Sequence, residues 1–433
     1  MVLKKIKKVV HKLSSTCNPC KIFDLVSNDP ISKNALIILL TLGMAAAAGF
    51  LFIIIAAKLY TIESLGIATL LLSYASIVII ITRFGNEQSM IWYYDETQKS
   101  SIYFSFFFIT TSSAIIFSLL LILMSYFGVL GTDYLFTYSA VFLVGVIILS
   151  ISQVSGGFFL ASGKPILYFL QNTVISSRFI ILLFLIPFGV LGIFGSLVIA
   201  SGLSSIFAVL LLYHYGIRFQ LPEKKILNIS YHYSMRNYIS DCLFTIPTFL
   251  IPIVVFFISG QKDTAIYSVS YAFASITFII PISIGYALFM SGCQEKTTIP
   301  SLKFVISAAL MLLMGITLIF FFWGNDIINV LGPDYSGSGE LIVIIMSSSI
   351  FALFFQIYSS KFKIFQEMNK LLMLNGVFFV ILMSLSCLFV LNMGLIGAGY
   401  AWVATYAICV VPMVFYTLLN KKYMHNDLLR PQA

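Results

Sequence analysis

Long apolar runs separated by short polar segments make up most of the chain between residues 35 and 419. A helix of about 20 apolar residues crosses a hydrocarbon core of roughly 30 Å, and in lipid its backbone groups hydrogen-bond within the segment. Strands of a membrane barrel would alternate polar and apolar positions over about 10 residues, whereas these runs are continuous. The pattern therefore predicts twelve membrane-spanning helices, at about 35–58, 65–82, 102–127, 134–161, 166–188, 192–215, 239–259, 264–290, 301–323, 340–360, 371–391 and 395–419.

Composition agrees with this pattern. Hydrophobic residues are 60% of the 433 residues and charged residues only 9%, with a mean hydropathy of +1.02. Soluble domains carry about 25% charged residues, so the chain cannot form an ordinary water-facing surface. The expected fold class is an all-α integral membrane protein.

The basic residues predict the orientation of these helices. If both termini lie in the cytoplasm, 22 of the 25 Lys and Arg residues fall in inner segments, and only Lys58 and Lys262 fall in outer ones. Arg178 lies within the fifth segment. Short cytoplasmic loops are enriched in Lys and Arg. If one helix were miscounted, basic loops would no longer alternate regularly with loops that lack Lys and Arg. We expect a multi-pass protein of the cytoplasmic (inner) membrane with both termini in the cytoplasm.

The two halves of the sequence resemble each other. Gly131-Thr-Asp-Tyr134 matches Gly332-Pro-Asp-Tyr335 at an offset of 201 residues, and Gly192-Ile-Phe-Gly195 matches Gly394-Leu-Ile-Gly397 at an offset of 202. Lys33-Asn34 answers Arg236-Asn237 after 203. Because six helices separate the equivalents, the repeats have the same orientation and are related by an axis along the membrane normal. We expect two parallel-related six-helix lobes, with the first and seventh helices facing each other.

The domain organisation follows from this repeat. We expect a basic cytoplasmic segment at 1–33, an N-lobe at 34–215, a cytoplasmic linker at 216–235, a C-lobe at 236–420 and a cytoplasmic tail at 421–433. The basic N-terminal segment suits anionic membrane lipids rather than nucleic acid. Cys17 and Cys20 form a single CxxC without a second cysteine pair, so no metal is expected.

Recognisable motifs cluster in the second half. Gly-x-x-Tyr at 332–335, the polar turn Glu367 to Lys370, an asparagine early in 371–391 and Gly394-x-x-Gly397 form one pattern, and Arg83-Phe84-Gly85-Asn86-Glu87 resembles its first-lobe counterpart. The chain resembles polysaccharide-repeat flippases (the O-antigen type) of the MATE-like superfamily. The resemblance implies alternating-access transport of undecaprenyl-pyrophosphate-linked oligosaccharides to the outer leaflet, for cell-surface polysaccharide or lipopolysaccharide. It implies partners among lipid-linked oligosaccharides, membrane lipids and polysaccharide assembly proteins.

Arg178 is the first candidate for substrate binding. It lies about 12 residues into the fifth segment, roughly 18 Å deep at 1.5 Å per residue, and ionisable groups at that depth are costly and usually functional. Gln171 lies seven residues earlier on nearly the same helical face. A guanidinium can bind phosphate through two parallel hydrogen bonds. The alternative is an arginine that contacts only protein groups.

A second group lies at the predicted inner ends of helices. Arg83 and Glu87 follow the second segment, and Arg236 and Asp241 begin the seventh. The functional hypothesis is a mouth whose arginines attract pyrophosphate and whose carboxylates act in gating or coupling. The alternative is that these long side chains reach the interface and reflect only the inner charge bias.

Three functions fit a membrane protein of this kind. The flippase is favoured, because Arg178 is the only deep charge and suggests an anionic cargo. An ion-coupled exporter of small cationic drugs on the same fold would need an acidic cavity. A membrane-embedded polysaccharide polymerase or ligase would need basic outer loops, whereas the longest outer loop, 324–339, has none. We expect a non-enzyme without a cofactor, and the coupling ion, H⁺ or Na⁺, is left open.

Overall fold

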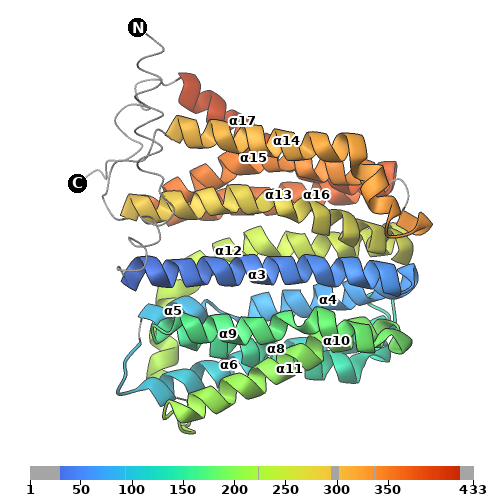
Figure 1. Ribbon diagram of the computed structural model, residues 1–433. Helices are drawn as coiled ribbons and strands as arrows, with labels where there is room; N and C mark the ends of the chain where they lie inside the picture. The colour runs from blue at the N-terminus through green and yellow to red at the C-terminus, as the bar shows by residue number, and fades with distance from the viewer. Residues whose placement is uncertain (1–29, 93, 223, 294–301, 336–337, 420–433) are drawn as a thin grey trace.

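The computed structural model describes residues 30–92, 94–222, 224–293, 302–335 and 338–419, which form helices and turns without strands (Figure 1). Twelve helical spans among these residues are long and apolar enough to cross a membrane, which confirms the all-α membrane fold. Cys17, Cys20 and the tail at 421–433 lie outside the described residues, as does segment 1–33 except its last four residues. The helices are α3 (Pro30–Leu59), α4 (Ile62–Thr82), α5 (Asn86–Trp92), α6 (Lys99–Tyr126), α7 (Tyr134–Thr137), α8 (Ser139–Ala161), α9 (Pro165–Ser176), α10 (Arg178–Phe184), η1 (Ile186–Phe188), α11 (Val190–His214), α12 (Lys224–Ser259), α13 (Gln261–Cys293), α14 (Leu302–Asn329), η2 (Pro333–Tyr335), α15 (Ser338–Ile364), α16 (Met368–Met393) and α17 (Leu395–Leu419).

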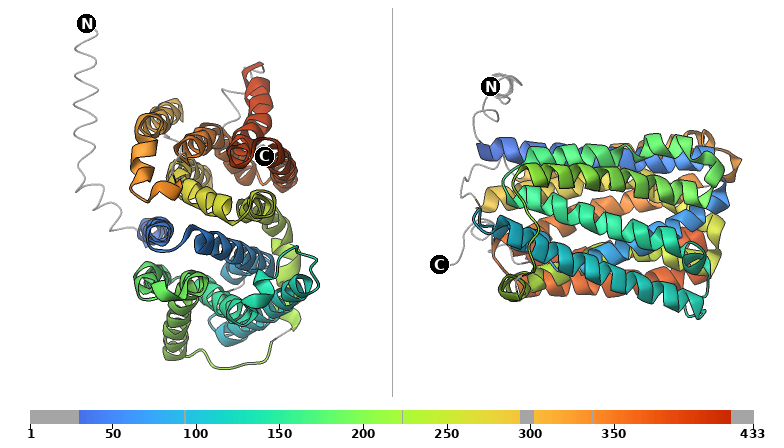
Figure 2. Two further views of the ribbon diagram at one scale, coloured as in Figure 1. Left: turned by 90° about the vertical axis from the view of Figure 1, so that its right-hand side faces the viewer. Right: turned by 90° about the horizontal axis from the view of Figure 1, so that it is seen from below.

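The helices gather into two lobes that lie side by side. Viewed along the helices, α3 to α11 form one group and α12 to α17 the other (Figure 2). We call the end of the bundle where α3 begins and α17 ends the terminal end, and the opposite end the distal end. Equivalent helices of the two lobes run in the same direction, as the repeat predicted. The predicted linker 216–235 is partly helical, because α12 already begins at Lys224.

The lobes meet along the second helix of each lobe. α4 packs against α13 and α12, while α3 contacts α13 on the other side. The second helix of each lobe thus makes the main contact between the lobes, and the expectation that the first and seventh helices face each other stays a prediction. Small side chains allow this contact, namely Gly66, Thr69 and Ser73 of α4 and Ser268 of α13. Helices in lipid approach closely where small residues line the contact.

Two predicted helices are interrupted. The segment expected at 166–188 divides into α9, α10 and η1, and the segment expected at 134–161 divides into α7 and α8. At the first break, Ser177 donates from its hydroxyl to the Val174 carbonyl at 2.7 Å, and its N–H bonds to the same carbonyl at 3.1 Å. Serine hydroxyls compete in this way for helix carbonyls and bend helices. Arg178 is therefore the first residue of α10 rather than a mid-helix residue.

One repeat match has to be shifted by three residues. Gly189 (φ +52°) precedes α11 and Gly394 (φ +66°) precedes α17. The N–H of Gly192 donates to Gly189 O at 2.9 Å, and that of Gly397 donates to Gly394 O at 3.0 Å. The structural equivalent of Gly394-x-x-Gly397 is thus Gly189-x-x-Gly192, and the predicted pairing with Gly192 and Gly195 is wrong. Glycine suits both turns because it adopts positive φ without strain.

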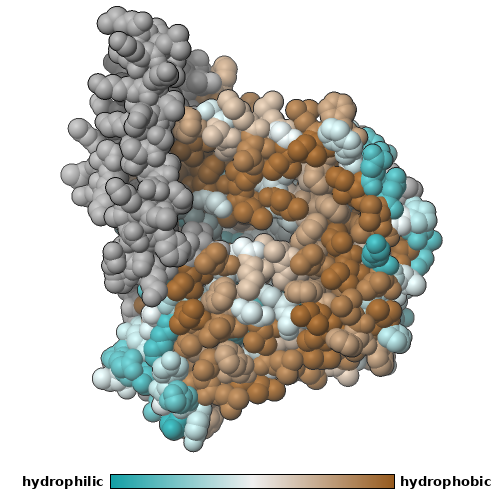
Figure 3. Space-filling model, viewed as in Figure 1, coloured by the Kyte–Doolittle hydropathy of each residue, from teal (hydrophilic) through white to brown (hydrophobic). Residues whose placement is uncertain are grey.

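The outer surface of the bundle is apolar. Large side chains such as Phe127 and Phe184 are 72% and 77% exposed, which is the expected surface against lipid tails. A hydrophobic belt crosses the molecule in Figure 3, with hydrophilic residues toward its ends and a paler hollow between the two halves. Several buried serines donate their hydroxyls to helix carbonyls, as Ser150 does to Ile147 O at 2.7 Å. The hydroxyl of Ser150 is therefore satisfied within its own helix.

Candidate functional site

A cavity of about 1240 Å³ lies at the terminal end. Its walls come from α12, α13, and the α15–α16 hairpin, with Arg83 at the end of α4 as the N-lobe contribution. Pockets for small molecules usually measure roughly 300–1,000 Å³. The cavity therefore has room for a headgroup larger than an ordinary small molecule.

Charged side chains surround this cavity with an excess of positive charge. Four basic residues line it, namely Arg83, Arg236, Lys363 and Lys370, together with two acidic residues, Asp241 and Glu367. Lys363 Nζ lies 3.9 Å from Asp241 Oδ1, and Lys370 Nζ lies 2.5 Å from Glu367 Oε1. Basic side chains thus outnumber acidic ones in the cavity lining. Such a site suits an anion.

The end of α4 positions Arg83. After Thr82 the chain turns through Phe84 (φ +46°) and Gly85 (φ +70°), which ends the helix beside the cavity. Tyr238 of α12 donates its hydroxyl to the carbonyls of Ile80, at 3.2 Å, and Ile81. These free carbonyls at the helix end need donors, and the tyrosine joins α12 to α4 while supplying one. The contact brings Arg83 and Arg236 to one cavity, as the sequence hypothesis of an arginine mouth required.

The C-lobe wall of the cavity is polar but uncharged in its deeper part. Asn375 of α16 donates to Ser240 O at 3.0 Å and to Ser240 Oγ at 2.9 Å. Ser360 Oγ of α15 donates to the Gly285 carbonyl of α13 at 2.7 Å. Asn375, Ser360 and the neighbouring Gln356 all line the cavity. Amides and hydroxyls of this kind match the hydrogen-bonding groups of sugars.

Arg178 does not line this cavity. Its guanidinium lies against α3, with Cζ 5.2 Å from the centre of the Phe52 ring, and a Cβ on Gly49 would lie 3.0 Å from its Nη2. Its Nε is buried without a hydrogen-bond partner among the described residues. The glycine at position 49 therefore makes room for the arginine. The binding role predicted for Arg178 stays a prediction.

Gln171 is also away from the cavity. It is 1% exposed, and its Nε2 donates to Ser152 O at 2.8 Å and to Ser152 Oγ at 3.2 Å. These bonds join α9 to α8 inside the N-lobe. The structure thus gives Gln171 a packing contact, and its substrate contact stays a prediction. Glu87 belongs to α5, but the placement of its side chain lies outside the description.

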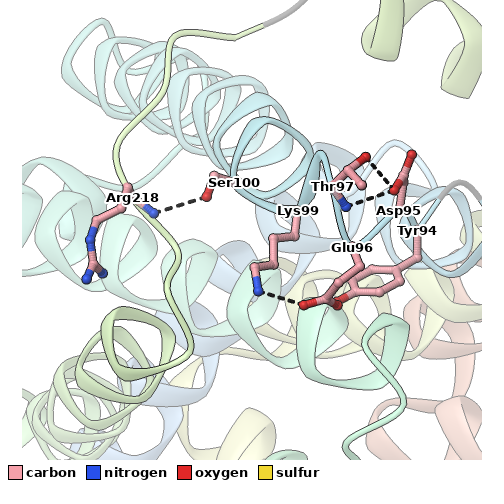
Figure 4. Close-up of polar contacts among 7 residues, drawn as sticks. All are labelled: Tyr94, Asp95, Glu96, Thr97, Lys99, Ser100 and Arg218. Carbon is pink, nitrogen blue, oxygen red and sulfur yellow. Dashed lines mark hydrogen bonds and ion pairs between the residues drawn. The ribbon is translucent and has the colours of Figure 1, made fainter.

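Sequence reasoning missed a polar cluster at the terminal end of the N-lobe (Figure 4). Glu96 accepts from Lys99 at 2.6 Å and from the Tyr94 hydroxyl at 2.6 Å, and these bonds lower the pKa of Glu96. Asp95 accepts from the Thr97 hydroxyl at 2.7 Å and its N–H at 2.8 Å, which lowers the pKa of Asp95. The charge bias alone explained Lys99, so the sequence carried no signal for the cluster.

It also missed Lys363 and Lys370 as cavity residues. Lys363 entered the sequence analysis only as an inner-side charge, and Lys370 only as the end of the polar turn at 367–370. The predicted short turn between the tenth and eleventh segments gave no sign that it folds over a cavity. Their place in the cavity depends on how α15 and α16 pack against α12 and α13.

The described residues form a membrane bundle with two parallel-related lobes of six spans and a cavity at its terminal end. The model of the polysaccharide biosynthesis protein family matches residues 31–290, which is more than half of the chain. The chain belongs to this family. A comparison with curated proteins found no match.

Solved transporter structures share the fold. An inward-facing multidrug resistance MATE family transporter of the MOP superfamily superposes with a TM-score of 0.67 at 15% identity, covering 88% of this chain and 96% of that one. The lipid II flippase MurJ in an inward closed conformation also gives 0.67, at 13% identity, with 88% and 87% covered. An outward-facing MATE transporter gives 0.58 at 15% identity, with 93% and 98% covered. At such identities the likeness concerns the fold alone.

Proposed function

We propose that this chain is a flippase that moves a lipid-linked oligosaccharide across the cytoplasmic membrane by alternating access. The cargo carries a pyrophosphate, and the product serves surface polysaccharide or lipopolysaccharide synthesis of the O-antigen type. The terminal end faces the cytoplasm in this proposal, so the cavity receives its cargo from the inner leaflet. No chemical step on the sugar is required of the chain.

The cationic cavity carries this proposal. Four basic side chains line the cavity, Arg83 and Arg236 among them, against two carboxylates, so the lining carries more positive than negative charge. Guanidinium groups bind phosphate oxygens with paired hydrogen bonds and remain charged in dry sites. The deeper amides and hydroxyls would then face the uncharged sugar. Family membership supports the same class of cargo.

The rival function is export of small cationic drugs on the same fold. A cationic drug needs carboxylates that are free to pair with it, and the cavity offers two carboxylates that lie near lysines. The excess of basic side chains would repel such a cargo. Drug export therefore fits the charge of this cavity less well than transport of an anion.

The test compares two arginines at the terminal end that differ in position. Arg236→Gln removes a charge from the cavity. Arg218→Gln removes one outside it, since Arg218 stacks on Tyr213 at 4.0 Å and does not line the cavity. A hydrogen bond to a charged group contributes about 1.5–3 kcal/mol, so we expect roughly a 10-fold or larger loss of transport for Arg236→Gln.

The assay measures surface glycan and membrane protein level together in a deletion strain that carries each variant. We expect Arg218→Gln to keep both signals, and Arg236→Gln to lose glycan at a normal protein level. Lipid-linked oligosaccharide then accumulates on the cytoplasmic side. Equal glycan for the two variants, or drug sensitivity as the only phenotype of the deletion, would contradict the proposal.

A further inference from the structure

The distal ends of α4 and α13 contain pairs of equivalent residues that touch each other. α4 begins at Ile62 and α13 at Gln261, each as the second long helix of its lobe, and these positions are 199 residues apart. Thr69 Oγ1 lies 3.1 Å from Ser268 Oγ, again 199 residues apart. Lys262 Nζ lies 3.4 Å from Glu63 Oε1 at the same separation.

Such pairs have a geometric meaning. Around a twofold axis, a residue meets its own equivalent only where the axis passes through the contact, as in the interface of a symmetric dimer. The pseudo-twofold axis that relates the lobes therefore passes between the distal ends of α4 and α13. The sequence has diverged there in a complementary way, because Glu63 faces a lysine instead of a second glutamate.

Gly66 lets the two helices approach at this point. A Cβ at position 66 would lie 2.0 Å from the carbonyl oxygen of Gln261 and 2.7 Å from its carbonyl carbon. These are backbone atoms, which cannot rotate aside as a side chain can. An approach of α4 to the backbone of Gln261 this close therefore requires glycine at position 66.

The N-lobe adds a second contact to the same end of α13. The side chain of Gln261 donates from Nε2 to the Tyr134 hydroxyl at 2.8 Å. The Tyr134 ring meets Phe256 of α12 edge-on, with centroids 5.9 Å apart. Tyr134 belongs to the Gly-x-Asp-Tyr motif at 131–134, so this repeat motif takes part in the contact between lobes.

We propose that these contacts form an outer seal, which closes the distal end while the cavity is open at the terminal end. We define the outer seal as Glu63, Gly66, Thr69, Gln261, Lys262 and Ser268. It parts along the pseudo-twofold axis when cargo is released. This inference rests on the proposed function only for the identity of the cargo, because opening and closing of the seal can be measured without cargo. From Ile62 to Thr69 it extends roughly 10 Å inward at 1.5 Å per residue.

A disulfide across the seal tests the proposal. In a cysteine-free background, Thr69→Cys and Ser268→Cys place sulfurs where oxygens are 3.1 Å apart. Thr245→Cys in the same chain reports on the cavity, because Thr245 lines it and is exposed. A protease site inserted at 219–222 separates the lobes, so that a cross-link is seen as fragments that remain joined until reduction.

The readout is labelling of Thr245→Cys by a membrane-impermeant maleimide from each side. Before oxidation we expect labelling from both sides, because the protein alternates. After oxidation we expect at least a 10-fold loss of labelling from the distal side, unchanged labelling from the terminal side, and recovery with a reductant. A control pair, Thr61→Cys with Ser64→Cys, has its oxygens 2.8 Å apart within one lobe and leaves both labelling rates unchanged.

Distal labelling that persists after cross-linking, or a pair that does not cross-link, would overturn the seal. Gly66→Ala supplies an independent check, since its Cβ holds the helices apart and raises distal labelling of Thr245→Cys without oxidation. Unchanged distal labelling in that variant also counts against the seal. Failure of the proposed function is distinguishable: cross-linked cells would then display normal surface glycan although the transporter is trapped.

Discussion

Two glycines one turn apart in α11 have opposite predicted effects on stability when each is replaced by alanine. A Cβ at Gly192 would lie 2.2 Å from the carbonyl oxygen of Leu185 and 2.9 Å from the Tyr60 hydroxyl, whereas a Cβ at Gly195 meets nothing within 4 Å. Ordinary contacts of this kind are 3.4 Å or longer. The backbone before α11 must therefore retreat by roughly 1 Å in Gly192→Ala.

The magnitude follows from two opposing terms. Overpacking costs about 1–3 kcal/mol, and the upper part of this range applies because the obstacle is backbone. Alanine in a helix gains about 1 kcal/mol over glycine, and this gain is all that Gly195→Ala changes. We expect Gly192→Ala to lose about 2 kcal/mol of the free energy of unfolding. Gly195→Ala should gain up to about 1 kcal/mol.

The assay is thermal denaturation of each purified variant in one detergent, followed by the fraction that remains monodisperse. Gly397→Ala is the matched variant in the other lobe, because its Cβ would lie 2.2 Å from the Phe389 carbonyl oxygen. We expect the melting temperatures of Gly192→Ala and Gly397→Ala to fall below the wild type and that of Gly195→Ala to rise. A melting temperature of Gly192→Ala at or above the wild type would refute the reasoning, as would equal losses for Gly192→Ala and Gly195→Ala.

Two further predictions concern charged groups outside the cavity. If Arg178 binds substrate as predicted, Arg178→Ala should reduce surface glycan, with Arg178→Lys intermediate. The protein level should stay normal, because the Nε has no hydrogen-bond partner among the described residues that truncation would leave unpaired. A parallel loss of glycan and protein would assign Arg178 a structural role. The lowered pKa of Asp95 means that its bonds to Thr97 are intact above the unfolded pKa of about 3.9 and are lost as pH falls through the folded pKa. Hydrogen exchange of the Thr97 N–H, corrected for intrinsic rate, should thus show constant protection between pH 7 and pH 5 and a loss only below about pH 4, and an earlier loss would contradict this assignment.

The sequence predicts the number and type of elements well because lipid imposes a strong constraint. A span needs a continuous apolar run, and the twelve runs correspond to twelve helical spans among the described residues. Breaks inside a span are harder to see. Ser177 and Tyr138 stand at breaks between helices that leave the apolar run intact. At Ser177 a single hydroxyl bonds to a nearby carbonyl, which hardly changes the hydropathy of the segment.

The site is only partly predictable for a different reason. Arg83, Arg236 and Asp241 were identified because they lie at the ends of spans, and the structure brings them to one cavity. Arg178 was singled out by depth, but depth does not say which neighbour a side chain faces. Lys363 was counted as a signal of membrane orientation and Lys370 as part of a polar turn. A lysine at the inner end of a helix can either reflect the inner charge bias or line a cavity, and the sequence does not separate the two. Only the packing of α15 and α16 separates these roles.

Symmetry between the lobes is kept where they touch and lost where cargo would bind. At the distal end, equivalent residues of α4 and α13 meet in pairs. At the terminal end, the C-lobe turn with Glu367 and Lys370 lines the cavity. The corresponding N-lobe turn instead places Lys164 over the Tyr215 ring at 3.5 Å, away from the cavity lining.

This difference has a physical reason in the proposed function. A seal on a pseudo-twofold axis is formed by equivalent segments, so divergence at one position must be matched at its equivalent, as Glu63 and Lys262 are. A lipid-linked oligosaccharide has no twofold symmetry, so its pyrophosphate and its sugars need different walls. One lobe can then keep a packed terminal face while the other forms the hollow. Differences in sugar preference between related chains should therefore map to the cavity-lining residues of α12, α13, α15 and α16.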